Sequence, residues 1–215
     1  MIVDVYHDIV CPWCRIGKAH LDQALSAWDG PPVEVRWRPF LLNPEAGPEP
    51  TDLMTYFREH HGVADPSQIF ARVEQAGANA GLRFRFDRAL SVPTRDAHRL
   101  LALTAPERQP ALLDALHHAY FEEGANLADL ETLADLAGDV GEDRAGMLRR
   151  LRAGEGTDAL EDALRQSAGI VQGGVPFFVF DDRYALSGAQ PPEMMLRALA
   201  AARDAAAGAT AGGGA

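Results

Sequence analysis

The two cysteines of this chain lie three positions apart, in the sequence Cys-Pro-Trp-Cys at positions 11–14. Residues 1–6 are expected to form a strand directly before them, and residues 15–28 show apolar side chains at helical spacing directly after them. Thiols at this spacing lie about one helical turn apart, close enough to form and reopen a disulfide. The pair therefore predicts a redox or metal site between the first strand and the first helix.

Counting potential ligands separates a metal site from a redox site. Zinc is normally held by four ligands, supplied by a second Cys-x-x-Cys pair or by two histidines three to five residues apart. The sequence contains neither arrangement. Two cysteines are also too few for a framework of structural disulfides, and a disulfide in a cytosolic protein is more often catalytic than structural. A redox-active pair is the favoured interpretation, and no metal is expected.

Composition and charge limit the classes of partner. Of the 215 residues, 47% are hydrophobic and 24% are charged, which suits a globular protein with a full core. A formal net charge of −11 argues against nucleic acid or an anionic membrane as the main partner. No apolar run approaches the roughly 18 residues of a membrane span, and no basic segment precedes an apolar one at the N-terminus. A cytoplasmic location is expected, and the oligomeric state, with a homodimer among the options, stays open.

Hydrophobic periodicity predicts few strands and many helices. Beyond the first strand, strand patterns occur only at residues 33–37, 175–180 and 184–186. Amphipathic segments, most of them separated by glycine or proline, predict helices at residues 51–60, 66–80, 94–104, 109–122, 129–137, 142–153, 157–168 and 191–202. Strand character is therefore confined to the two ends of the chain.

This distribution predicts an α/β fold with an insertion. Residues 1–43 and 156–205 are expected to form one α/β domain, interrupted by an all-helical domain at residues 44–155. Residues 206–215 are alanine and glycine with a single threonine, offer almost nothing to bury, and are expected to form a disordered tail.

The cysteine pair can be assigned distinct chemical roles. Cys11 lies at the expected helix start, where unpaired backbone N–H groups and the helix dipole favour a thiolate, and Pro12 suits the first helical turn. Cys11 is therefore expected to be the exposed nucleophile and Cys14, one turn later, the shielded resolving thiol. Trp13 can line a substrate surface. Asp8 would oppose thiolate formation if it is buried nearby.

A second signal lies at Val175-Pro176, before the apolar run Phe-Phe-Val-Phe. A proline at the start of a strong strand marks either an edge strand or a cis peptide bond. Alone, the edge-strand interpretation is the simpler one. In a chain that also carries Cys-x-x-Cys after its first strand, the cis bond is favoured.

Together these motifs give the chain a resemblance to the DsbA family of thioredoxin-fold disulfide oxidoreductases. It looks closest to the FrnE-like branch, which is similar to 2-hydroxychromene-2-carboxylate isomerases and kappa-class glutathione transferases. The segments that carry the resemblance are residues 8–14, residues 94–100 (Thr-Arg-Asp-Ala-His-Arg-Leu), residues 174–180 and residues 187–190 (Ser-Gly-Ala-Gln).

The resemblance implies a thioredoxin-like fold with an inserted all-helical domain. It implies that Val175 and a cis Pro176 pack against Cys11, and that the backbone before the proline pairs with a bound polypeptide. Pro12 and Trp13 complete the expected substrate-binding residues. The isomerase and transferase relatives have serine in place of the nucleophilic cysteine, whereas this chain keeps both cysteines.

The expected function is a thiol–disulfide oxidoreductase that cycles Cys11 and Cys14 through a mixed disulfide with a protein or small thiol. No bound cofactor is expected, with glutathione as a candidate co-substrate. The first alternative is a glutathione-dependent isomerase or transferase acting on a small aromatic or polyketide-like molecule. The second is a non-catalytic binding module that uses the groove beside Val175. Neither alternative requires Cys14.

Overall fold

The computed structural model describes residues 1–211 and divides them into two compact units. The sheet unit consists of Met1–Phe40 and the chain from Gln166 onward, and the helical unit is Leu41–Arg165. The boundaries expected from the sequence lay after residues 43 and 155. The second division instead falls inside helix α8 (Thr157–Ile170), because this helix runs from one unit into the other.

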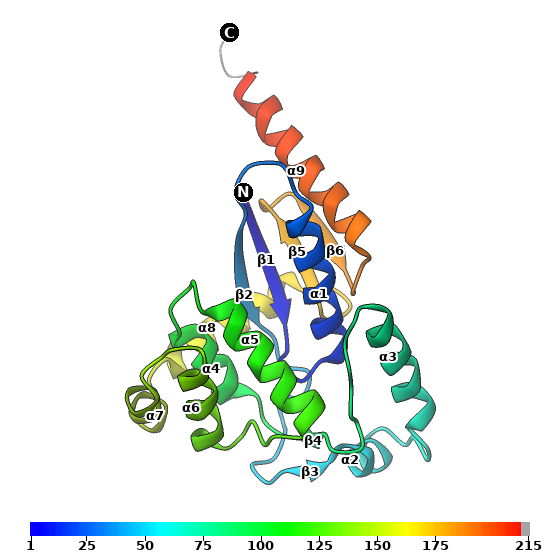
Figure 1. Ribbon diagram of the computed structural model, residues 1–215, viewed down its shortest axis with the longest axis vertical. Helices are drawn as coiled ribbons and strands as arrows, with labels where there is room; N and C mark the ends of the chain where they lie inside the picture. The colour runs from blue at the N-terminus through cyan, green and yellow to red at the C-terminus, as the bar shows by residue number, and fades with distance from the viewer. Residues whose placement is uncertain (212–215) are drawn as a thin grey trace. The chain divides into compact units, whose positions relative to one another are not determined.

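The sheet unit is built on four strands in the order β2-β1-β5-β6 (Figure 1). β1 is parallel to β2 and antiparallel to β5, which in turn is antiparallel to β6. A parallel pair needs a crossover connection, and helix α1 supplies it between β1 and β2. The bounds of these elements are Ile2–His7 for β1, Pro12–Ser26 for α1, Glu34–Pro39 for β2, Phe177–Phe180 for β5, Tyr184–Ser187 for β6 and Pro192–Ala211 for α9.

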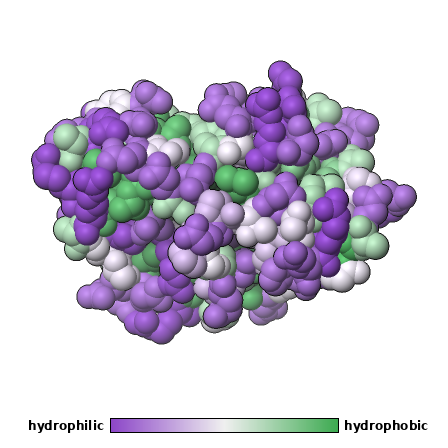
Figure 2. All heavy atoms as spheres, turned by 90° about the horizontal axis from the view of Figure 1, so that it is seen from below, coloured by the Kyte–Doolittle hydropathy of each residue, from purple (hydrophilic) through white to green (hydrophobic). Residues whose placement is uncertain are grey.

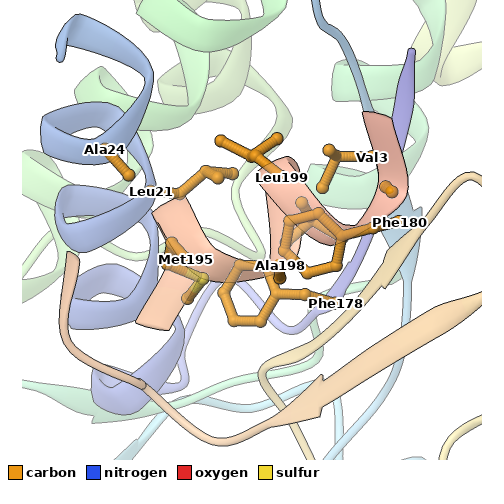
Figure 3. Packing of buried hydrophobic residues seen from close by; sticks show 10 residues of the cluster. Val3, Leu21, Ala24, Phe178, Phe180, Met195, Ala198 and Leu199 are labelled. Carbon is orange, nitrogen blue, oxygen red and sulfur yellow. The ribbon is translucent and has the colours of Figure 1, made fainter. Parts of the chain in front are cut away.

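The core of the sheet unit lies between the sheet and the helices α1 and α9. Alternate residues of a strand point to the same face, so Val3 and Val5 of β1 share a face with Phe178 and Phe180 of β5. Figure 3 shows Val3, Phe178 and Phe180 converging on side chains of the two helices. The buried helix residues in this core are Leu21, Ala24, Met195, Ala198, Leu199 and Ala202. β1 and β5 are buried at nearly every position, as central strands of the sheet.

The turn between β5 and β6 uses two aspartates with left-handed backbone. Asp181 and Asp182 are the first two residues of the three-residue loop, and their φ values of 47° and 54° lie in the left-handed region, which aspartate tolerates better than most residues. The Asp181 carboxylate also accepts a hydrogen bond from the backbone N–H of Ile2 at 2.6 Å. The hairpin of β5 and β6 is therefore tied to the first strand.

The helical unit contains more than helices. A two-stranded antiparallel sheet pairs Thr51 with Ser91 and Asp52 with Leu90, so the expected all-helical insertion is corrected at this point. Two residues per strand are too few to create an alternating pattern in the sequence. The elements of this unit are β3 (Thr51–Asp52), α2 (Leu53–His60), α3 (Ser67–Asn79), β4 (Leu90–Ser91), α4 (Arg95–Leu103), α5 (Gln109–His118), η1 (Ala119–Glu123), α6 (Leu130–Asp139), α7 (Arg144–Arg152) and the first part of α8.

Aromatic side chains form much of the core of the helical unit. Phe84 and Phe86 stack with a centroid distance of 5.3 Å, and Phe121 meets the ring of Phe84 edge-on at 4.9 Å. Phe121 belongs to η1, a single π-helical turn that directly continues α5. The wider turn lets the Phe121 carbonyl accept the N–H of Arg85 at 2.7 Å.

The C-terminal segment differs from its expected disorder. Helix α9 continues through Ala211, whereas a disordered tail was expected from residue 206 onward. Alanine has the highest intrinsic helix propensity, so an alanine-rich extension can prolong a helix that is already anchored by packing. Residues 212–215 of the expected tail lie outside the described residues.

The face of the molecule in Figure 2 is dominated by hydrophilic side chains, with apolar side chains in small separate groups. Within residues 1–211, no helix combines the length and the apolar character needed to cross a membrane.

Candidate active site

Cys11 stands at the junction between β1 and α1, as the residue that caps the helix. Its backbone is extended, its N–H donates to the Asp8 carbonyl at 3.0 Å, and its carbonyl accepts the N–H groups of Cys14 at 3.0 Å and Arg15 at 3.2 Å. Pro12 follows in the first turn, where a missing N–H leaves no helical hydrogen bond unmade. The tight turn fixes the Cys11 side chain at the start of the helix.

Cys14 lies one turn further along α1, and its thiol is strongly disposed to stay protonated. Burial raises its pKa well above the usual value, and the neighbouring Cys11 sulfur raises it further. A hydrogen bond from the Asp8 backbone opposes this rise, while the Asp8 carboxylate adds to it. The Asp8 side chain is buried. Asp8 was expected to oppose thiolate formation, and its carboxylate does so at Cys14.

The two cysteines are equally buried, which corrects the expectation of an exposed nucleophile. Each is a free thiol with 3% of its surface exposed. The helix start that was expected to expose Cys11 is covered by surrounding residues, and one sequence offers no measure of that covering. The distinction between the thiols lies in their neighbours, because only Cys11 has a hydrogen bond to the loop before β5.

That loop carries Val175 and Pro176, joined by a cis peptide bond. The Cys11 thiol donates to the Val175 carbonyl over 3.7 Å, although 164 positions separate the two residues. Gly173 and Gly174 lead into the loop with φ of 82° and 119°, values that favour glycine. The loop and the cysteine pair thus form one site within the sheet unit.

Gly17 is a site residue that the sequence did not single out. A side-chain carbon built on Gly17 would lie 2.9 Å from Cγ of Pro176 and 3.1 Å from Cζ of Phe178. The absence of a side chain allows α1 to approach the cis-proline loop closely. A glycine inside a predicted helix is the signal that could have pointed to such a contact.

The remaining residues near the thiols differ in exposure. Trp13 lies between the cysteines in sequence, and its side chain is 42% exposed. Lys18, one turn after Cys14, is buried and pairs with Asp22 at 2.8 Å. Its ammonium group also lies 5.9 Å from the ring centre of Trp37. The positive charge of Lys18 is therefore partly balanced by the Asp22 carboxylate.

The segment at residues 94–100 takes part in the packing of the helical unit. Arg99 is buried and donates to the carbonyls of Leu151 and Glu155 at 2.9 Å each, where α7 ends. Arg95 pairs with Glu161 of α8. These contacts assign the segment a structural role, because its charged side chains satisfy carbonyl groups that a helix end leaves open.

Within residues 1–211, no group of three or more histidine, cysteine or acidic side chains is arranged to hold a metal ion. The site described above is a buried dithiol at a helix start, with one thiol bonded to the carbonyl before a cis-proline. A site of this kind on a four-stranded sheet with α1 and α9 on one face defines a protein of the thioredoxin-fold class.

Residues 2–200 match the DSBA-like thioredoxin domain, and the chain belongs to this family. A crystal structure of a probable DsbA oxidoreductase from Streptomyces coelicolor is 34% identical and superposes with a TM-score of 0.86. The match covers 95% of this chain and 90% of that one. The protein YwbO of Bacillus subtilis is 28% identical over 188 residues, which cover 84% of this chain and 86% of that protein.

Two more distant structures share the fold. The cytosolic disulfide reductase DsbM from Pseudomonas aeruginosa, solved with GSH, is 20% identical with a TM-score of 0.61 and covers 94% of this chain and 98% of its own. A 2-hydroxychromene-2-carboxylate isomerase is 14% identical with a TM-score of 0.68 and covers 96% and 98% of the two chains. The resemblance to the DsbA family noted in the sequence, and the thioredoxin-like fold with an inserted, largely helical part, are confirmed.

Proposed function

We propose that this protein is a thiol–disulfide oxidoreductase that cycles Cys11 and Cys14 between dithiol and disulfide. The observation that carries the proposal is the Cys11 thiol at the start of α1, bonded to the Val175 carbonyl, with Cys14 one turn behind it. Membership of the DSBA-like family supports it. The proposed substrates are proteins or small molecules that carry thiols or disulfides.

The reaction with a substrate disulfide proceeds in two exchanges. The Cys11 thiolate attacks one substrate sulfur, so that a mixed disulfide forms and the other substrate sulfur leaves as a thiolate. Cys14 loses its proton and attacks the Cys11 sulfur, which releases the second substrate thiolate and closes the Cys11–Cys14 disulfide. Two electrons have passed to the substrate, and two thiol equivalents restore the dithiol. The reverse sequence oxidises a substrate dithiol.

The raised pKa of Cys14 gives the two steps an order. At neutral pH the Cys14 thiol stays protonated, because burial and the Cys11 sulfur disfavour its anion. Once Cys11 is part of a mixed disulfide, its sulfur carries no negative charge, and that contribution to the raised pKa is lost. Cys14 therefore becomes easier to ionise when its attack is needed.

The loop before β5 and the exposed part of α1 supply substrate contacts in this proposal. The backbone at Val175 pairs with an extended stretch of a bound polypeptide, a form of strand addition in which main-chain hydrogen bonds give affinity. Pro176 fixes this backbone, and Pro12 and Trp13 line the same surface. Glutathione is the proposed small thiol, a choice supported by the DsbM structure with GSH. The cytoplasmic location stays a prediction.

A pair of matched substitutions tests the proposal. Cys11→Ser should reduce the rate of insulin disulfide reduction with glutathione to the background rate, because no nucleophile remains at the helix start. Cys14→Ser, incubated with oxidised glutathione, should accumulate a mixed disulfide at Cys11, measured as the mass of the intact protein. Both variants replace one sulfur atom with one oxygen atom, so a difference in their behaviour comes from the different positions of the two cysteines.

Two results would contradict the proposal. Full insulin reduction by Cys11→Ser would remove this residue as the nucleophile. Glutathione-dependent isomerisation of a chromene carboxylate by Cys14→Ser at the wild-type rate would assign the site to the isomerase reaction, which needs no second thiol.

A further inference from the structure

The end of β6 and the residues that follow it fold back on themselves and on the cis-proline loop. This segment, residues 187–190, contains Gly188, whose N–H donates to the Pro176 carbonyl at 2.8 Å. The Gln190 N–H donates to the Gly188 carbonyl at 2.8 Å, and the Gln190 side chain donates to the Ser187 carbonyl at 2.8 Å. Gly188 has φ of 80°, a conformation that lets the segment turn sharply. The Pro176 carbonyl is therefore held by the 187–190 segment.

Helix α1 holds the same segment through a histidine. Nδ1 of His20 lies 2.9 Å from the Gln190 carbonyl oxygen, across 170 positions of sequence. A carbonyl oxygen only accepts hydrogen bonds, so Nδ1 must carry the proton in this contact. The neutral tautomer with hydrogen on Nδ1 and the imidazolium form both satisfy this requirement. The His20 side chain therefore donates this hydrogen bond to the 187–190 segment.

These contacts form a continuous connection from α1 to the site. His20 bonds Gln190, Gln190 bonds Gly188 through the backbone, and Gly188 bonds Pro176. Pro176 follows Val175, whose carbonyl accepts the Cys11 thiol. Cys11 caps the start of α1, and His20 lies near the middle of the same helix. Both are hydrogen-bonded to the part of the chain between Val175 and Gln190.

We propose that His20 is a positioning residue for the redox site. By holding the Gln190 carbonyl, it keeps the 187–190 segment in place, and through Gly188 it fixes the backbone at Val175 and Pro176 opposite Cys11. The structural part of this inference stands on the hydrogen bonds alone. Its consequence for substrate binding rests on the proposed function, because the Val175 backbone is the proposed partner of the bound polypeptide.

Three substitutions separate the hydrogen bond from the rest of the side chain. His20→Leu removes the donor and keeps a similar volume, whereas His20→Asn places an amide N–H close to the position of Nδ1. His60→Leu is the matched control, since Nδ1 of His60 makes the same kind of contact with the Tyr56 carbonyl, at 3.2 Å, on an exposed helix of the helical unit. Thermal unfolding of each variant checks that the fold is intact.

The first measurement is the amide hydrogen exchange rate of Gly188 by NMR. We expect exchange to be about two- to tenfold faster in His20→Leu, the factor that loss of one typical hydrogen bond gives. His20→Asn and His60→Leu should stay close to the wild type. The second measurement is the reduction of a peptide disulfide, for which His20→Leu should raise KM by a similar factor with little change in kcat, and His20→Asn should restore KM.

Wild-type exchange at Gly188 in His20→Leu would overturn the proposal, and so would His20→Asn behaving like His20→Leu in both measurements. A failure of the proposed function would look different. In that case the wild type itself would reduce no disulfide, while the exchange rates of Gly188 would still decide whether His20 positions the segment.

Discussion

At the scale of single residues, Cys11 and Cys14 are alike in burial and different in surroundings. Cys11 caps α1 and bonds to the Val175 carbonyl, whereas Cys14 lies behind it, close to the buried Asp8. The sequence correctly places Cys14 as a shielded thiol. It overstates the exposure of Cys11, whose thiol lies against the carbonyl of Val175, a residue 164 positions further along the chain.

The raised pKa of Cys14 predicts how stability depends on pH. In the unfolded chain the thiol ionises near its ordinary pKa of about 8.5, while in the folded protein it stays protonated to higher pH. The protonated Cys14 thiol therefore makes its full contribution to the free energy of unfolding below about pH 8.5. As the pH rises from there toward the folded pKa, the free energy of unfolding falls by up to about 1.4 kcal/mol per pH unit. Urea unfolding of the reduced protein at pH 7, 8.5 and 9.5 measures this loss.

The control for this experiment is Cys14→Ala, which lacks the titrating group and keeps every other ionisable residue. Its unfolding free energy should fall less between pH 8.5 and 9.5 than that of the wild type, by about 1 kcal/mol. Parallel curves for the two proteins would show that Cys14 is not the group responsible.

At the scale of elements, the site depends on how closely α1 approaches the loop before β5. Gly17→Ala would add a carbon 2.9 Å from Pro176, in a place where the ring cannot easily move. Overpacking costs about 1–3 kcal/mol, and alanine recovers about 1 kcal/mol of helix propensity. We expect a net loss of about 1 kcal/mol in unfolding free energy, measured in urea, and slower insulin reduction.

Gly169→Ala in α8 is the matched control, since a side-chain carbon there would contact nothing within 4 Å. This variant should be more stable by about 0.5–1 kcal/mol, the gain in helix propensity without a clash. Equal stabilisation by both substitutions would contradict the close contact between Gly17 and Pro176.

The elements that the sequence predicted well are those with a clear local pattern of apolar residues. The strands β1, β2, β5 and β6 and the expected helices all occur, mostly within one to three residues of their expected ends. The missed features depend on contacts between distant residues. The sequence around Gly17 gives no sign of its contact with Pro176, and the sequence around His20 gives no sign of its hydrogen bond to Gln190. The strand β3 forms by pairing with β4, about 40 residues further along the chain.

At the scale of the whole molecule, the sheet unit is assembled from two segments separated by about 125 residues. The first contributes β1, α1 and β2, and the second contributes β5, β6 and α9. β1 lies between β2 and β5, so each segment completes the other's sheet. The helical unit is one continuous stretch of chain and needs neither segment for its own connectivity.

This organisation predicts the behaviour of a nicked protein. Glu45 is exposed, lies in a stretch without regular structure and is followed by alanine, so a glutamate-specific protease should cut after it first. The fragments should separate on a denaturing gel and elute together in gel filtration, because β1 stays paired with β5 and α1 stays packed on α9. Release of the N-terminal fragment under native conditions would contradict this assembly.

The central place of β1 also has a consequence for how the protein is made. During synthesis Cys11 leaves the ribosome 164 residues before Val175, the residue whose carbonyl bonds to it, and Cys14 follows directly after Cys11 in the same helix. The helical unit can fold on the ribosome as soon as it has emerged, whereas the sheet waits for β5. Throughout that interval the two thiols of the nascent chain are not yet buried by the folded sheet unit. The cysteine pair is therefore open to oxidants before the cis-proline loop has been made.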